Sequence, residues 1–61
     1  MNLKLTRISQ GLTQEQLRQR AKVGLSTIVK LERGDIDGIR VGTLKKIASA
    51  LGKDVVELFF S

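Results

Sequence analysis

Residues 14–34 read QEQLRQRAKVGLSTIVKLERG and contain two short apolar patterns on either side of Lys22-Val23-Gly24. In both patterns the apolar side chains recur three or four residues apart, at Leu17, Ala21, Ile28 and Leu31. This spacing places the apolar side chains along one side of an α-helix. The stretch therefore predicts two short helices joined by a tight turn.

Thr13 and Gln16 have the form of a capping box at the start of the first helix. In such a box the Thr13 hydroxyl accepts from the Gln16 amide, and the Gln16 side chain returns to the Thr13 amide. The first helix is therefore expected to begin at Gln14. The second is expected over about 25–33, and Gly34 can cap its C-terminal end.

The outer face of the helix over 25–33 is polar and basic. Opposite its buried side, the helical repeat brings together Ser26, Lys30 and Arg33, flanked by Thr27 and Val29. The side chains on this face are therefore short, polar or basic.

Three further helices are expected around this pair, and no stretch shows the sustained alternation of a half-buried strand. The helix over 2–10 is expected to bury Leu5, Ile8 and the following Leu12, and to end at Gly11. The helix over 41–51 is expected to end at Gly52 and to bury Val41, Leu44, Ile47, Ala48 and Leu51. The prediction is an all-α fold.

Asp54 and Glu57 form a second cap-like pair, which predicts a short fifth helix. Its apolar residues Val55, Leu58 and Phe59 can complete the core. The chain has 61 residues, so we expect one domain over 1–61 with a small core.

Composition limits the classes of site that the chain can carry. It has no Cys and no His, which excludes disulfides and nitrogen or sulfur zinc sites, and we expect no metal or cofactor. No apolar run approaches the roughly 20 residues of a membrane span, so we expect a soluble, intracellular protein. Eleven Lys and Arg against six Asp and Glu give a net charge of +5, which favours polyanionic partners or a solvated basic surface.

An enzymatic function is not expected. The sequence offers no His base, no Cys nucleophile and no Gly-rich phosphate loop of the Walker type. Its glutamates at positions 15, 32 and 57 are explained by helix starts or ion pairs. No small-molecule ligand is predicted.

Residues at the helix junctions form an ordered set of motifs: Gly11-Leu12-Thr13-Gln14, Leu17, Ala21, Val23, Ser26-Thr27-Ile28, Leu31-Glu32-Arg33-Gly34, Ala50-Leu51-Gly52 and Glu57-Leu58-Phe59. This set resembles the lambda-repressor and Cro type of helix-turn-helix domain, the Xre family, over nearly the whole chain. The resemblance implies a compact five-helix bundle in which the second and third helices form the helix-turn-helix. Lys22 departs from the usual turn glycine, and Gly24 replaces the usual Ser or Thr cap.

The resemblance also implies sequence-specific binding of double-stranded DNA by a small transcriptional regulator, in the manner of a repressor, in the cytoplasm of a bacterial or phage-infected cell. By position in the family, the base-contacting residues are Leu25, Ser26 and Lys30, in a helix that enters the major groove. The backbone-contacting residues are Gln14, Thr27, Arg33 and Arg40. In the family the pair that matches Arg7 and Glu32 joins the first helix to the third, so a structural ion pair is expected there.

Val56 and Phe60 lie four residues apart in the fifth helix, beside its core-facing residues. Such an apolar pair with no core left to fill predicts a homodimer interface. Related repressors dimerise near this end, which implies a palindromic operator with half-sites about 34 Å apart. An apolar tail left by truncation of a longer protein is the alternative.

A protein-interaction module, such as an antitoxin or an adaptor of another regulator, is the main alternative function. An antitoxin is expected to need an added segment for its toxin, whereas this sequence ends soon after the fifth helix. A basic peptide on a ribosome or membrane would have no reason for Ser26 and Thr27, and RNA recognition more often uses exposed aromatic side chains.

Overall fold

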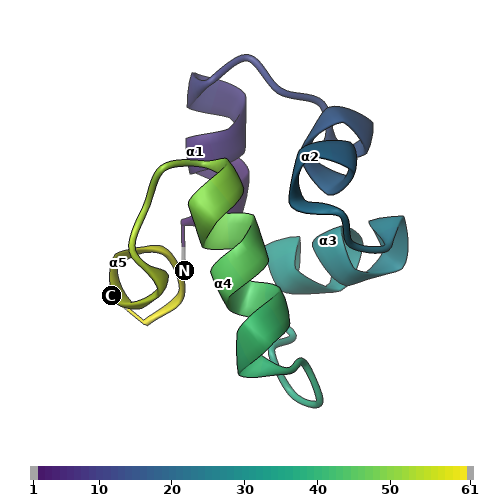
Figure 1. The fold of residues 1–61 in the computed structure, drawn as a ribbon, viewed down its shortest axis with the longest axis vertical. Helices are drawn as coiled ribbons and strands as arrows, with labels where there is room; N and C mark the ends of the chain where they lie inside the picture. Colours follow the sequence, from purple (N-terminus) through teal and green to yellow (C-terminus); the bar gives the residue numbers. More distant parts are fainter. Residues whose placement is uncertain (1, 61) are drawn as a thin grey trace.

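The computed structural model describes residues 2–60, and these residues form five α-helices and no strand (Figure 1). The helices are α1 (Leu3–Ser9), α2 (Gln14–Ala21), α3 (Leu25–Glu32), α4 (Val41–Ala50) and α5 (Val55–Phe59). The all-α, five-helix prediction is confirmed. Within residues 2–60 no helix has the length and apolar character needed to cross a bilayer.

The core lies between α2, α3 and α4, because α2 packs against both of the other helices. The other two helices pack on the outside of this group: α1 packs on α3, and α5 packs on α4. The largest fully buried side chains come from all five helices: Leu3, Leu17, Ile28, Leu31, Ile47 and Leu58. Since burying one such side chain is worth about 1.5–3 kcal/mol, this shared core fixes the position of α3.

The predicted buried side of α1 is wrong. Leu12, which follows the helix, is buried as expected, but Leu5 is 71% exposed and Ile8 is 53% exposed, whereas Leu3 and Arg7 are buried. Leu3 and Arg7 also lie four residues apart, so they satisfy the helical repeat equally well. Hydrophobicity alone favoured the other face, because it does not anticipate that a charged residue is buried by pairing.

The predicted buried side of α4 holds except at its first residue. Leu44, Ile47, Ala48 and Leu51 are buried, but Val41 is 60% exposed. Figure 1 shows why, since the first turn of α4 extends beyond α2 and α5 toward the loop 33–40. In α5, Leu58 and Phe59 are buried as predicted, while Val55 is half-buried against the core.

Both predicted capping boxes are present. At α2 the Gln16 amide donates to Oγ1 of Thr13 at 3.0 Å, and the Thr13 amide donates to Oε1 of Gln16 at 2.9 Å. At α5 the Asp54 side chain accepts from the Val56 amide at 2.9 Å, and the Asp54 amide donates to Glu57. These bonds satisfy amides that the first turn of each helix would otherwise leave without partners.

Helices α1 to α4 all end with a residue in the left-handed conformation. Three of these residues are glycines, as predicted: Gly11, Gly34 and Gly52. The fourth is Lys22, with φ of 59°, and after it the Val23 amide donates to the Arg18 carbonyl at 3.1 Å. This is the six-residue closing bond of a Schellman motif. Lys22 thus makes the turn with a Cβ that glycine would lack, at a cost of about 1–2 kcal/mol.

Two hydrogen bonds hold α1 against the C-terminal part of the chain. The Asn2 amide donates to the Leu58 carbonyl at 3.0 Å, and Nε2 of Gln10 donates to the Leu51 carbonyl at 2.8 Å. α1 is therefore held at both of its ends, although Leu5 and Ile8 are exposed on its outer side.

Candidate nucleic-acid interface

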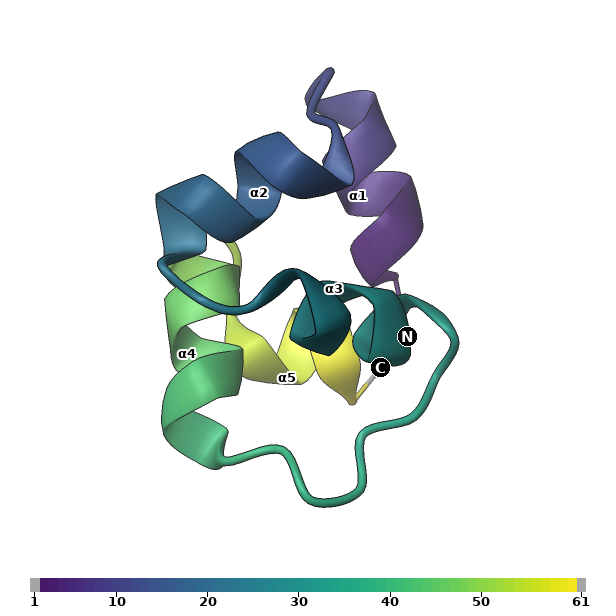
Figure 2. The same ribbon diagram turned by 90° about the vertical axis from the view of Figure 1, so that its right-hand side faces the viewer.

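The turn between α2 and α3 leaves the N-terminal end of α3 at the surface. Gly24 caps α3 with an extended backbone and no side-chain hydrogen bond, and its carbonyl accepts from the Thr27 amide at 3.2 Å. Figure 2 faces the side of the molecule where α2, α3 and the loop 33–40 come together. Free amides at this end of α3 suit the approach of an anion or a base edge.

The outer face of α3 presents the residues that the sequence singled out. Ser26 and Arg33 are exposed, and Lys30 and Thr27 are half-buried along the side of the helix. Leu25 is exposed at the first position of α3. On the opposite side, Ile28 and Leu31 are fully buried, so α3 shows the polar and apolar division that the sequence predicts.

Arg7 and Glu32 form a bidentate ion pair between α1 and the end of α3. Nε of Arg7 donates to Oε2 of Glu32 at 2.5 Å, and Nη2 donates to Oε1 at 3.1 Å. Nη1 of Arg7 donates to the Leu12 carbonyl at 2.7 Å. Both side chains are largely buried, which makes the geometry of the pair rigid and specific.

Gln14 also bonds to the Arg7–Glu32 pair, a contact that the sequence did not predict. Its Nε2 donates to Oε1 of Glu32 at 3.0 Å, so the side chain of the first residue of α2 is held by the last residue of α3. Glu32 therefore accepts from α1 and from α2 at once. The two residues lie 18 positions apart, and no local pattern in the sequence signals that they meet.

The Glu32 carboxylate is stabilised in its ionised form. Burial tends to raise its pKa, but the hydrogen bonds from Arg7 and Gln14, with the charges of Arg7 and Lys4, lower that pKa below the usual value of 4.5. Glu32 is thus a charged acceptor that orients both partners at neutral pH.

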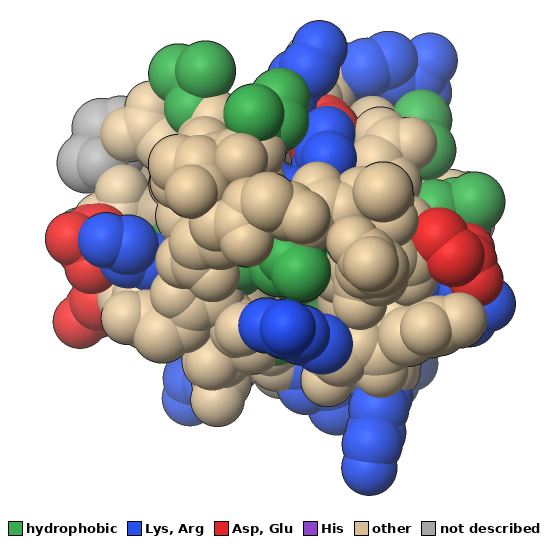
Figure 3. All heavy atoms as spheres, turned by 90° about the horizontal axis from the view of Figure 1, so that it is seen from above, with side chains coloured by type: hydrophobic (Ala, Val, Ile, Leu, Met, Phe, Trp, Pro, Cys, Tyr) green, Lys and Arg blue, Asp and Glu red, His purple; other side chains and the backbone are tan. Residues whose placement is uncertain are grey.

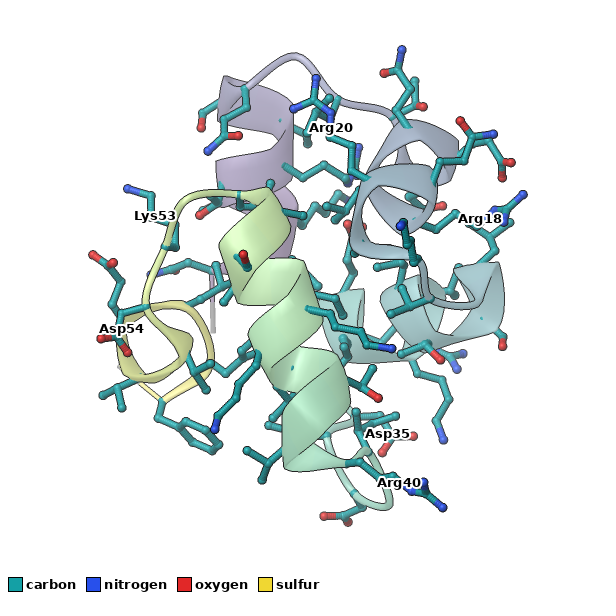
Figure 4. All side chains as sticks on the ribbon, in the orientation of Figure 1. Arg18, Arg20, Asp35, Arg40, Lys53 and Asp54 are labelled. Carbon is teal, nitrogen blue, oxygen red and sulfur yellow. The ribbon has the colours of Figure 1, made fainter. Side chains whose placement is uncertain are left out.

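Arg40 is the N-cap residue of α4 and is exposed. Its backbone carbonyl accepts from the Thr43 amide at 3.0 Å, while its side chain makes no capping bond. Figure 4 shows the Arg40 side chain extending to the lower right, on the side of the molecule that Figure 2 faces. Arg40 therefore lies on the same side as α2 and α3.

An exposed ion pair lies one residue beyond Gln14 on α2. Nε and Nη2 of Arg18 donate to the two carboxylate oxygens of Glu15 at 3.0 and 2.5 Å, and Nε2 of Gln19 donates to Oε1 at 3.2 Å. Sequence reasoning assigned Glu15 to a helix start or a pair without naming a partner. The three-residue spacing of Glu15 and Arg18 was the available signal.

Positive charge is spread over more than one part of the surface. Seen from above in Figure 3, Lys and Arg side chains occur at several separate places around the molecule. Net charge alone therefore does not locate a DNA-binding face.

Val56 and Phe60 are exposed on α5 and at its C-terminal cap, at 63% and 60%. Both side chains are available to contact another molecule. Among residues 2–60 there is no group of three acidic, Cys or His side chains arranged to hold a metal ion, and that part of the chain encloses no ligand-sized pocket.

The bundle and its helix-turn-helix unit define the class of a DNA-binding domain. A model of the helix-turn-helix family matches residues 3–58. The chain belongs to this family, in its Cro/C1 or Xre type, and the resemblance drawn from the sequence is confirmed. The family is non-enzymatic.

A curated relative from Mycobacterium tuberculosis, named "Putative antitoxin HigA2", is 40% identical over 53 residues. The match covers 87% of this chain and 52% of the relative, so the chain spans about half the length of that protein. No solved structure shows significant similarity to the chain.

Proposed function

We propose that this protein is a transcriptional regulator that binds specific sequences of double-stranded DNA and acts as a repressor in the bacterial cytoplasm. The observation that carries the proposal is the division of α3 into a fully buried face and a polar, basic outer face within a helix-turn-helix domain. An α-helix fits the major groove of B-DNA, where every base pair presents a distinct pattern of donors and acceptors.

Leu25, Ser26 and Lys30 are the proposed base-contacting residues. Lys30 can donate to O6 or N7 of guanine, and Ser26 can donate to or accept from a base edge. Leu25, exposed at the first position of α3, can pack on a thymine methyl group. Specificity then comes from α3.

Gln14, Thr27, Arg33 and Arg40 are the proposed contacts to the DNA backbone. Gln14 lies at the start of α2, where free amides and the helix dipole favour a phosphate. Its Nε2 has two hydrogens, and the bond to Glu32 uses one of them. The second hydrogen remains for a phosphate oxygen, in an orientation that Glu32 sets.

Dimerisation through Val56 and Phe60 is the proposed route to a palindromic operator. These exposed apolar side chains would be buried by the same residues of a second copy. A two-fold axis near α5 would place two copies of α3 about one turn of duplex apart.

Selection of binding sites from a random duplex library at physiological salt tests the proposal. We expect one enriched motif with inverted-repeat symmetry. A motif without symmetry would contradict the dimer, and failure to enrich any motif would contradict sequence-specific binding.

A second candidate function is that of an antitoxin, which the name of the Mycobacterium tuberculosis relative favours. This role would add a protein toxin as a partner and is compatible with DNA binding. Growth rescue tests it: a toxin encoded beside this chain's gene should arrest growth, and coexpression of this chain should restore it. Persistent arrest with a well-expressed chain would contradict the role.

A further inference from the structure

The starting observation is the exposed cluster of Glu15, Arg18 and Gln19 on α2. Arg18 holds both carboxylate oxygens of Glu15, and Gln19 donates to one of them. The hydrogen bond from Arg18 is the main cause that lowers the pKa of Glu15 below its usual value of 4.5. In the free protein the guanidinium of Arg18 is therefore paired with a carboxylate of its own helix.

Arg18 and Arg20 belong to the same helix but extend toward different sides of the molecule. In Figure 4 Arg18 extends to the right, like Arg40, toward the side formed by α2, α3 and the loop 33–40. Arg20 lies near the top of the same view, toward α1. Arg18 is also four residues after Gln14, so the two project from neighbouring positions on α2.

We propose that Arg18 is a further contact to the DNA backbone, and that Glu15 competes with phosphate for it in the free protein. The proposal rests on the proposed DNA-binding function. Glu15 then acts as a restraint on sequence-independent affinity, because every phosphate must displace it from Arg18.

The exchange is physically easy. Exposed ion pairs of this kind contribute little to stability, since water and salt screen them and two long side chains must be ordered. Arginine binds phosphate in the same bidentate geometry that it uses for a carboxylate. Phosphate neutralisation also releases condensed counterions from DNA, which favours the exchange at low salt.

Arg18→Ala and Arg20→Ala form a matched pair of variants, because each removes one positive charge from α2. Binding of a short, labelled duplex of random sequence is measured by fluorescence anisotropy at several salt concentrations. One phosphate contact contributes about 0.9 to the slope of log affinity against log salt. When salt rises from about 50 to 200 mM, the fold-decrease in affinity should therefore be roughly threefold smaller for Arg18→Ala than for wild type. Arg20→Ala should keep the wild-type slope.

Glu15→Gln tests the restraint separately. This change keeps the size of the side chain and removes its charge, so the affinity of the random duplex should rise about threefold or more at low salt. In the Arg18→Ala background the same change should raise affinity by less, because no arginine is left to be released.

The outcomes separate this inference from the proposed function. Equal salt slopes for the two arginine variants would overturn the role of Arg18, while the DNA-binding proposal would stand. Unchanged or weaker binding by Glu15→Gln would overturn its role as a competitor. A folded wild-type protein that binds no duplex DNA at any salt concentration would overturn both proposals together.

Discussion

Gln14 and Glu32 are joined by a hydrogen bond in which Nε2 of Gln14 donates to Oε1 of Glu32 at 3.0 Å. The same oxygen accepts from Arg7 at 3.1 Å. The first residue of α2 and the last residue of α3 are thus fixed relative to each other, with α1 holding them from behind. A residue proposed to contact the DNA backbone is thereby tied to the helix proposed to contact the bases.

Replacement of Arg7 tests this arrangement. Arg7→Ala leaves the largely buried Glu32 without its ionic partner, so we expect unfolding free energy to fall by about 3 kcal/mol. Chemical denaturation measures the loss, with exposed Arg20→Ala as the control. DNA affinity should fall as well. Wild-type stability and affinity in Arg7→Ala would show that the pair does not position α3.

Glu32 also predicts a dependence of stability on pH. Its pKa is lowered in the folded protein below the usual value of 4.5, so its contribution to stability is complete above that value and is lost as pH falls through the lower folded pKa. The unfolding free energies of wild type and Glu32→Gln should therefore converge below about pH 4. A difference that stayed constant down to pH 3 would argue against the ionised acceptor.

Lys22 offers a test of backbone strain. Lys22→Gly removes the Cβ from a residue at φ of 59° and should stabilise the protein by about 0.5–1 kcal/mol, after the entropy cost of glycine. Lys22→Ala is the matched control, since it loses the same charge and retains the Cβ. Equal stabilities of the two variants would mean that the turn is not strained.

The dimer prediction depends on the exposed side chain of Phe60. Phe60→Asp should shift the protein to monomer in sedimentation equilibrium, because a charge would be buried at the centre of the apolar contact. Folding is checked by circular dichroism. Identical masses for variant and parent over the whole concentration range would contradict a dimer formed through Phe60.

Much of the fold followed from local patterns. Capping boxes at Thr13 and Asp54, and glycines at the ends of α1, α3 and α4, placed the helices because caps depend on neighbouring residues. The buried face of α3 followed from its 3.6-residue repeat for the same reason. These features need no information about distant parts of the chain.

The errors and omissions share a different cause. The prediction of the buried face of α1 was wrong because Arg7 is buried by pairing with Glu32, a residue 25 positions away. The bond between Gln14 and Glu32 was missed because it likewise joins distant positions. Neither can be derived from periodicity or composition. The base-contacting and backbone-contacting roles remain predictions carried over from the family.

The central claim is that α3 determines sequence preference while Gln14 supplies affinity without preference. Its most direct test is the ratio of affinities for the selected operator and random duplex, measured for wild type, Lys30→Ala and Gln14→Ala. We predict that Lys30→Ala lowers this ratio by about tenfold, as expected for loss of a base contact worth 1–3 kcal/mol. Gln14→Ala should weaken both affinities about equally and preserve the ratio. The reverse pattern, with the ratio lost in Gln14→Ala and kept in Lys30→Ala, would contradict the account.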